Sequence, residues 1–367
     1  PLIDLGEGKN INSIEWGGNQ PAGTRIEIRT RTGNEVIEAF TFHDKNGKEV
    51  TQKRYGKLIP SFRGAIDTTR VPGSDWSPWS RIYSFSNEAF LSPSPRRYME
   101  VDIRMTSDSP DRAATLDYLA ANFTEPLAGR ALGEISPQQA EPGVLTEITY
   151  HLKPQNTSGF DRLAVESAAP LYFTKVARNG VELDVQADST KNGFIVHFPN
   201  RIRTDQLIEL KFKSSVFRQS TRFDVFLKDS NQDESVRQRV DPGDASAQIE
   251  SNTNVVSLPV SQNLFANIAL NSPVITPNGD GVNDELRLSA DLVNVLQPRP
   301  LRMRLYDLAG HLVYDYSEDV RAGQQQFSWD GRDRSGTRVT PGVYVLEIAV
   351  EGDAGDERAQ EVISIVY

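Results

Sequence analysis

Apolar and polar residues alternate along most of the chain, in short segments that are separated by Gly, Pro, Asn and Asp. In residues 98–107 (YMEVDIRMTS), the apolar side chains fall at every second position and the charged ones lie between them. A period of two residues is typical of a strand with one buried and one wet face. The same alternation recurs in 23–33, 144–152, 207–212, 222–227, 301–307 and 362–367. The pattern predicts an all-β protein that is built of antiparallel sheets.

One segment fits a helix as well as a strand. In residues 111–123 (DRAATLDYLAANF), Leu116, Leu119, Ala120 and Phe123 have helical spacing. The segment nevertheless follows the strand around Ile103 across only a short turn, SDSPD. A short connection favours a strand that returns to pair with its predecessor, so we expect a strand here.

Two stretches interrupt the alternation and mark domain boundaries. Residues 125–143 contain three Pro and three Gly, and residues 271–281 (NSPVITPNGDG) are similarly rich in turn formers. A chain of 367 residues suits two or three domains that each bury a core. We expect tandem antiparallel β-sandwiches: a jelly-roll-like domain at 1–125, an Ig-like domain at 126–270 and a second Ig-like domain at 271–367.

Composition and charge narrow the class of protein. Hydrophobic residues make up 38% and charged residues 25% of the chain, as in soluble globular proteins. The net charge of −10 disfavours nucleic acid, whose phosphates need a basic face. No apolar run is long enough for a membrane span, and the absence of Cys excludes disulfides and cysteine-bound metals. The opening PLIDLGEGKN shows neither an initiator Met nor a signal peptide, so we expect a processed product or the C-terminal part of a longer protein.

The stretch TPNGDGVNDELRL (276–288) raises the question of calcium. If Gly281 is set at position 6 of an EF-hand loop, Thr276 stands at position 1 and Arg287 at position 12, where acidic ligands are required, so this is not an EF-hand. Hard cations accept any convergent oxygens, and a tight turn would use the same residue types. Ca²⁺ is the one cofactor that the sequence suggests, and its candidate ligands are Asn278, Asp280, Asn283 and Asp284.

Three stretches near the C-terminus carry a family resemblance. TPNGDGVNDELRL, LRMRLYDLAGHLVYD and FSWDGRDRSGTRVTPGVYVLEIAV follow one another within residues 271–367. Together they resemble the Ig-like domain of bacterial exported proteins, of the flagellar hook-capping and the gliding-motility or type IX sorting kind. The resemblance implies export to the bacterial surface or beyond, with Trp329 in a sandwich core, DGRDRSG as a tight turn and a strand that starts with Pro341 and Gly342. Because the ending VISIVY lacks the basic residues expected of a type IX signal, the secretion route stays open.

The segment SDWSPWS (74–80) matches the WSxWS box of cytokine receptors and the tryptophan ladder of thrombospondin type 1 repeats. Both families depend on disulfides, so we interpret these matches as coincidental. Trp76 and Trp79 either anchor a loop on the first domain or form an exposed platform for a sugar ring. The segment SPSPRRYMEVDIRM (92–105) resembles the galactose-binding-like jelly rolls found beside bacterial hydrolases. We expect Arg96 and Arg97 in a solvated turn, with contact to an acidic ligand as the alternative.

No catalytic motif is present: the sequence lacks GxSxG, HExxH, a P-loop and GxGxxG, and its four histidines are scattered. We therefore expect a non-enzymatic, extracellular structural or adhesive protein, such as a stalk, a surface-layer component or a filament subunit. The alternatives are a carbohydrate-binding accessory region of a secreted enzyme and a scaffold in flagellar or motility assembly. The expected partners are further copies of the chain or other surface proteins, bound through sheet edges, with glycans as the alternative ligand.

Overall fold

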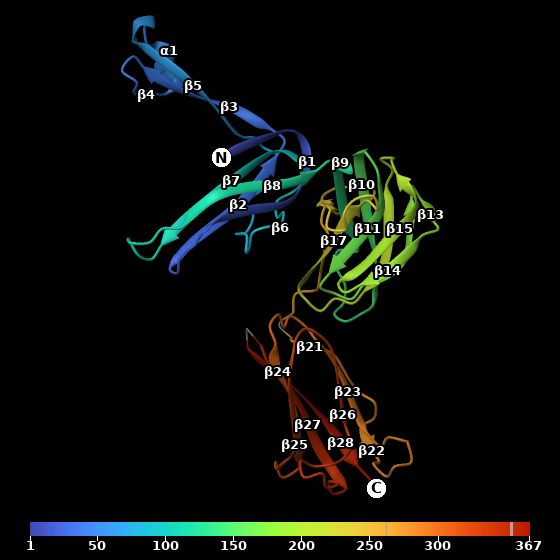
Figure 1. Cartoon of the computed structure of the whole chain (residues 1–367). Coiled ribbons are helices and arrows are strands. Elements are labelled where there is room, and N and C mark those ends of the chain that lie inside the picture. Colours follow the sequence, from blue (N-terminus) through green and yellow to red (C-terminus); the bar gives the residue numbers. More distant parts are fainter. Residues whose placement is uncertain (262, 353–354) are drawn as a thin grey trace.

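The computed structural model describes residues 1–261, 263–352 and 355–367, and it is almost entirely β-structure. Figure 1 shows three β-rich bodies that follow one another along the chain, with a narrow projection on the first body. Nearly all strand pairs are antiparallel, and the described exceptions are two short parallel pairs. The predicted all-β class with several antiparallel sheets is confirmed.

The first domain is organised around one long strand, β1. Its first half pairs with β7, and its second half pairs with β8. A small core of Ile14, Ile28 and Met99 lies against this sheet, and the segment between the projection and β7 covers it with Tyr83. The ambiguous segment is a strand, as predicted, but it pairs with β1 and not with its predecessor β7, so the expected pairing is wrong. The strands are β1 (Leu2–Asn19), β2 (Thr24–Gly33), β6 (Glu88–Ala89), β7 (Arg96–Ser107) and β8 (Thr115–Thr124).

A projection, which we call the arm, comprises residues 36–72. It leaves the first domain after β2 and stands away from the rest of the molecule, shown in blue in Figure 1. Its sheet has the order β4-β3-β5, so β5 pairs on one side only. The elements are β3 (Val36–Asp44), β4 (Glu49–Val50), the helix α1 (Gln52–Lys57), a 3-10 turn (Pro60–Phe62) and β5 (Arg63–Pro72).

The second domain is a sandwich of two sheets over the largest core of the molecule. Tyr150, Phe160, Phe212 and Phe223 are among its largest fully buried side chains. Burial of each such side chain contributes about 1.5–3 kcal/mol. One sheet is β13 (Val181–Leu183), β12 (Tyr172–Arg178), β16 (Ile208–Ser214), β10 (Thr146–Thr157), β9 (Ala128–Ser136) and β19 (Asp241–Pro242). The other is β14 (Gln186–Thr190), β15 (Gly193–Ile202), β11 (Phe160–Ser167), β17 (Ser220–Lys228) and β18 (Gln238–Arg239), with β20 (Val255–Ser257) beside β17.

The third domain is a smaller sandwich with Trp329 in its core, as the resemblance implied. Trp329 is 4% exposed, and its ring lies 5.8 Å from that of Tyr314. The strand that was expected to start with Pro341 and Gly342 begins at Gly342. One sheet is β21 (Phe265–Leu270), β23 (Leu286–Leu292) and β26 (Gly323–Trp329). The other is β22 (Val274–Ile275), β28 (Asp356–Ile365), β27 (Gly342–Glu351), β24 (Arg299–Asp307) and β25 (Leu312–Val320), so β25 is an edge strand.

Arg96 and Arg97 do not lie in a solvated turn, and that expectation is wrong. Both belong to β7 and form ion pairs. Arg96 reaches Asp241 of the second domain, and Arg97 bonds to Asp4 of β1 at 3.0 Å. The two residues are neighbours on a strand, so their side chains point to opposite faces and reach different partners. No helix among the described residues has the length and apolar character that crossing a membrane requires.

Candidate functional site

The segment that carries Trp76 and Trp79 runs alongside β2. The backbone N–H of Ser77 donates to the carbonyl of Thr32 at 2.9 Å, and that of Ser80 donates to the carbonyl of Thr30 at 2.8 Å. In return the two serine hydroxyls accept from the N–H groups of the same threonines, at 3.2 and 3.1 Å. The edge of β2 is thereby satisfied by a loop instead of a strand.

The two tryptophans and two arginines of β2 form a stack, which we call the Trp–Arg ladder. The guanidinium of Arg31 lies 5.7 Å from the ring of Trp76 and 4.5 Å from that of Trp79. The guanidinium of Arg29 lies 5.6 Å from the ring of Trp79. These distances are within the range of cation–π attraction. Because Arg29 and Arg31 are two residues apart on a strand, both point toward the loop.

Carboxylates on β7 hold the two arginines in place. Arg31 is paired in register with Glu100, and its Nε donates to the carboxylate at 2.7 Å. Arg29 is paired in the same way with Asp102, at 3.1 Å from Nε. The ladder is therefore built by opposite charges on adjacent strands, and no disulfide is needed to position it.

The base of the arm is tied to the same ladder. Trp76 donates its indole N–H to the carbonyl of Glu35, and the carboxylate of Asp75 accepts the N–H groups of Asn34 and Glu35 at 2.8 and 3.0 Å. Gly33 is required by close packing, since a Cβ there would lie 2.4 Å from the indole of Trp76. This geometry fits the loop-anchor alternative, since guanidinium groups already lie over both tryptophan rings. The ligand-binding role of Trp76 and Trp79 stays a prediction.

The stretch 276–284 forms a turn in which the candidate calcium ligands already have backbone partners. The carboxylate of Asp284 accepts the N–H groups of Gly279 and Gly281, both at 2.7 Å. Asp280 accepts from Val282 at 2.8 Å, and its own N–H donates to the side chain of Asn278 at 2.9 Å. The two bonds to Asn278 and Asp280 join a side chain to the N–H two residues on, and they close Asx turns.

Backbone geometry completes the turn. Gly279, Gly281 and Asn283 have φ values of 89°, 85° and 53°, in the left-handed region that Gly and Asn tolerate. Donation by Gly279 and then Gly281 holds the pKa of Asp284 below its usual value. The plain turn explains all these contacts. The structure thus brings Asn278, Asp280, Asn283 and Asp284 into one turn, and calcium binding there stays a prediction.

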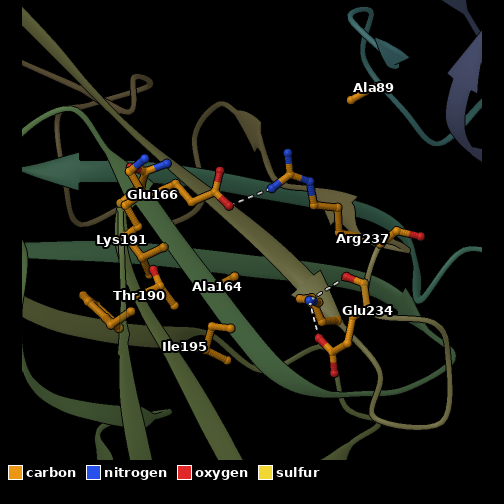
Figure 2. A pocket seen from close by; sticks show the side chains of 13 residues that line it. Ala89, Ala164, Glu166, Thr190, Lys191, Ile195, Glu234 and Arg237 are labelled. Atoms are coloured by element: carbon orange, nitrogen blue, oxygen red, sulfur yellow. Dashed lines mark hydrogen bonds and ion pairs between the residues drawn. The ribbon is translucent and has the colours of Figure 1, made fainter. Parts of the chain in front are cut away.

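A cleft of about 470 Å³ lies between the first and second domains and is shown in Figure 2. Ala89 of β6 faces it from the first domain, and the other lining residues belong to the second. Arg237 donates to Glu166 at 2.7 Å, and Lys228 donates to the carboxylate of Glu234 at 2.8 Å.

The charges of this cleft are largely paired. Hydrogen bonds from Lys228, and then from Arg162, hold the pKa of Glu234 below its usual value. Glu234 is therefore held as a carboxylate and is a poor proton donor at neutral pH. Asn10 of β1 donates to the carbonyl of Arg237 at 3.2 Å, beside the cleft. The arrangement suits a polar joint between two domains.

The histidines do not meet in one site. His43 lies in the arm, His151 and His197 lie on opposite sheets of the second domain, and His311 lies in a turn of the third. Burial lowers the pKa of His151, so its ring is neutral at pH 7. Across residues 1–261, 263–352 and 355–367, no three His, Cys, Asp or Glu side chains gather as metal ligands.

The arm is a candidate contact surface that the sequence reasoning missed. Its five most exposed large apolar side chains are between 44% and 61% exposed: Ile37, Phe40, Ile59, Phe62 and Ile66. Val50 alone among the described arm residues is buried to 9% or less. A clustering of exposed apolar side chains marks interaction surfaces. The run of Lys and Arg in 45–63 was the available signal.

Comparison with known proteins gives one family match. Residues 268–365 match the model of the CHU_C Type IX secretion signal domain. The match covers about the last quarter of the chain, where the sequence resembled exported Ig-like domains. No curated protein matches the sequence.

Solved structures show only distant likenesses. Purple acid phosphatase PPD1 from yellow lupin is 11% identical, with 64% of this chain and 41% of that chain covered and a TM-score of 0.29. PorZ, a surface component of the type IX secretion system of Porphyromonas gingivalis, is 14% identical, with 39% and 15% covered and a TM-score of 0.20. The major pilin SpaD of Corynebacterium diphtheriae is 11% identical, with 97% and 92% covered and a TM-score of 0.26. The chain spans less than half the length of the phosphatase and of PorZ, and TM-scores this low carry no argument about function.

The sequence alone resembled two kinds of export domain, the flagellar hook-capping kind and the type IX kind. The family match is to the type IX kind and so names the secretion route. A type IX secretion signal implies delivery to the outside of a bacterium, and such cargo is associated with the surface. The protein is therefore an all-β bacterial protein whose residues 268–365 form a type IX secretion signal domain and direct it to the cell surface or beyond.

Proposed function

We propose that the protein is a non-enzymatic structural or adhesive component of the bacterial surface, which holds its partners through the edges of its sheets. The observation that carries the proposal is the arm. It presents a strand with one unpaired edge, β5, together with several exposed apolar side chains. An unpaired edge is a template for strand addition, and apolar side chains beside it supply affinity.

The other parts of the molecule are consistent with a structural or adhesive role. The second domain has a large core. An ion pair between Arg96 and Asp241 joins it to the first domain. A hydrogen bond from the N–H of Asn294 to the carbonyl of Phe217, at 2.8 Å, joins it to the third. A series of β-domains joined in this way places the arm and the secretion domain at opposite ends (Figure 1). The carbohydrate-binding alternative has less support, because Arg29 and Arg31 stack on the tryptophan rings.

Replacement of the arm tests the proposal. Val36 and Pro72 are directly paired, so residues 37–71 can be replaced by the two-residue turn Asn-Gly without moving β2. Cells that display this variant should lose attachment to surfaces or to one another, while antibody labelling shows the same amount of protein outside the cell. Cells that display the Lys213→Glu variant, altered at an exposed residue of the second domain, serve as the control. Unchanged attachment after arm replacement would overturn the proposal.

A further inference from the structure

The arm differs in charge from the rest of the molecule. Residues 36–72 contain seven Lys or Arg and four Asp or Glu, a net charge of +3. The whole chain carries −10, so the residues outside the arm carry −13. A basic projection on an acidic body attracts acidic surfaces, while two bodies repel one another.

The basic side chains of the arm are not neutralised within the molecule. All ion pairs that Lys or Arg side chains form with carboxylates among the described residues lie outside the arm. Lys53, Arg54 and Lys57 are exposed on α1, a helix with no buried residue. Hydrogen bonds from Arg63 to the carbonyls of Leu58 and Gly56, at 2.9 and 3.1 Å, hold the chain after this helix in place. The positive charge is therefore presented on an ordered surface.

Three properties of the arm together define its partner. The unpaired edge of β5 calls for a polypeptide strand, since a lipid or a polysaccharide cannot continue a sheet. The exposed Phe40 and Ile66 call for apolar side chains on that strand. β5 itself carries Arg63 and Arg70 against the single carboxylate of Asp67. Basic residues at a sheet edge repel another basic edge and favour an acidic one, because opposite charges on neighbouring strands stabilise the pair.

One edge of this chain has the required properties. β25 is the last strand of its sheet in the third domain, and it is 9 residues long against 10 for β5. Glu318 and Asp319 are exposed on it and form no ion pair with a described residue. Leu312 and Tyr316 are 45% and 39% exposed on the same strand. β25 is thus acidic and partly apolar at an open edge.

We propose that the arm of one molecule docks on the β25 edge of a second copy, with β5 added beside β25. The inference deepens the proposed function, on which it rests, by naming the partner of the arm. Arm and third domain lie at opposite ends of the molecule (Figure 1), so the contact joins two molecules. Because the two surfaces are different, a bound pair keeps one free arm and one free β25, so further copies can add at both ends and form a chain of molecules.

Charge exchange tests this contact in the full chain. Sedimentation velocity at a series of protein concentrations measures association at about 20 mM and 500 mM salt, since salt screens attraction between exposed charges. The wild type should associate at low salt and dissociate at high salt. The arm variant Lys53→Glu, Arg54→Glu, Lys57→Glu should weaken association by about tenfold or more, since like charges now meet. The edge variant Glu318→Lys, Asp319→Lys should do the same.

The combined variant gives the decisive result. It carries both sets of changes and should associate again, because the two charges are exchanged and not removed. The control Arg104→Glu, Arg130→Glu, Lys213→Glu makes the same charge change as the arm variant at exposed residues of the first and second domains, and it should associate like the wild type. Circular dichroism of each variant verifies that it is folded.

Specific outcomes would overturn the inference. One is a wild type that stays monomeric at every protein and salt concentration, and this includes a monomer whose arm binds vesicles of anionic phospholipid. The other is a combined variant that does not regain association. The attachment assay separates this result from the proposed function. If the protein is monomeric but attachment still depends on the arm, the second copy is rejected as the partner and the adhesive function stands. If the protein associates in a charge-dependent way but arm replacement leaves attachment unchanged, the adhesive function is rejected and the contact between copies stands.

Discussion

Arg96 of β7 and Asp241 of β19 form an ion pair between the first and second domains, with 2.7 Å between Nη2 and Oδ2. The two side chains are only 15% and 12% exposed. A buried ion pair stabilises little relative to apolar packing, but removal of one partner leaves an uncompensated charge. The pair therefore fixes how the two domains meet, and it is sensitive to substitution at either end.

Arg96→Ala should loosen this joint at a cost of about 3–5 kcal/mol, because Asp241 is left buried without its partner. We expect a separate, lower melting transition of the first domain in calorimetry and faster proteolysis near residues 125–127. The adjacent Arg97 provides a matched control. Its pair with Asp4 is exposed, at 46% and 34%, so Arg97→Ala should destabilise the protein much less than Arg96→Ala does. Equal effects of the two substitutions would contradict the assignment.

Arg31→Ala should destabilise the first domain by about 1–2 kcal/mol, because Arg31 stacks on both tryptophans of the ladder. The loss of stacking should also change the fluorescence of Trp76 and Trp79. Arg25 lies on the same strand and has an exposed side chain outside the ladder, so Arg25→Ala serves as the control and should have almost no effect. Denaturant unfolding followed by tryptophan emission measures both. If Arg31→Ala behaves like Arg25→Ala, the ladder does not stabilise the domain.

Asp284 should make the third domain sensitive to acid. Its folded pKa is lowered by donation from Gly279 and Gly281, so its contribution to stability is fully present above its unfolded pKa of about 3.9 and is lost as the pH falls through the folded pKa. Asp284→Asn should therefore lower the melting temperature at pH 7, and the difference from the wild type should shrink below about pH 4. A difference that stays constant down to pH 2 would show that the charge of Asp284 is not involved.

Calcium binding at the same turn can be tested with the wild type alone. Asp280 and Asp284 already accept backbone N–H groups, so we expect a chelator to leave the melting temperature of the third domain unchanged. A bound ion would stabilise by about 2.7 kcal/mol at a hundredfold excess over its dissociation constant. A melting temperature that falls with chelator, and no longer does so after Asp280→Ala and Asp284→Ala, would establish the calcium site.

Alternation along the sequence was sufficient to predict the strands, because the residues of a strand show by themselves which of its two faces is apolar. The alternation does not show whether another layer of the fold covers the apolar face. In β7 the predicted apolar face holds Met99 and Val101, which are 1% and 3% exposed, but also Met105, which is 53% exposed. The arm shows the same effect, since β3 carries Phe40 on a face with no covering sheet. Burial depends on packing between segments that are distant in the sequence, so local periodicity alone cannot predict it.

The candidate sites show a similar division. The turn at 278–284 was predictable because Asn, Asp and Gly act within a few residues of one another. The ladder was not, because Arg31 and Trp79 meet only when the loop folds back along β2. We interpreted the WSxWS match as coincidental because the chain lacks Cys, yet carboxylates on β7 position the arginines without a disulfide. The absence of Cys excludes a stack held by disulfides, but it does not exclude a stack whose arginines are positioned by carboxylates.

The arm leaves and re-enters the first domain at a single point, where Val36 faces Pro72. A segment with adjacent entry and exit can be lengthened, shortened or exchanged by mutation with little disturbance of the packed core. The residues that fold the protein and those that export it lie elsewhere in the chain. Selection, or a protein engineer, can therefore replace one contiguous segment, residues 36–72, while the packed domains and the secretion signal stay unchanged.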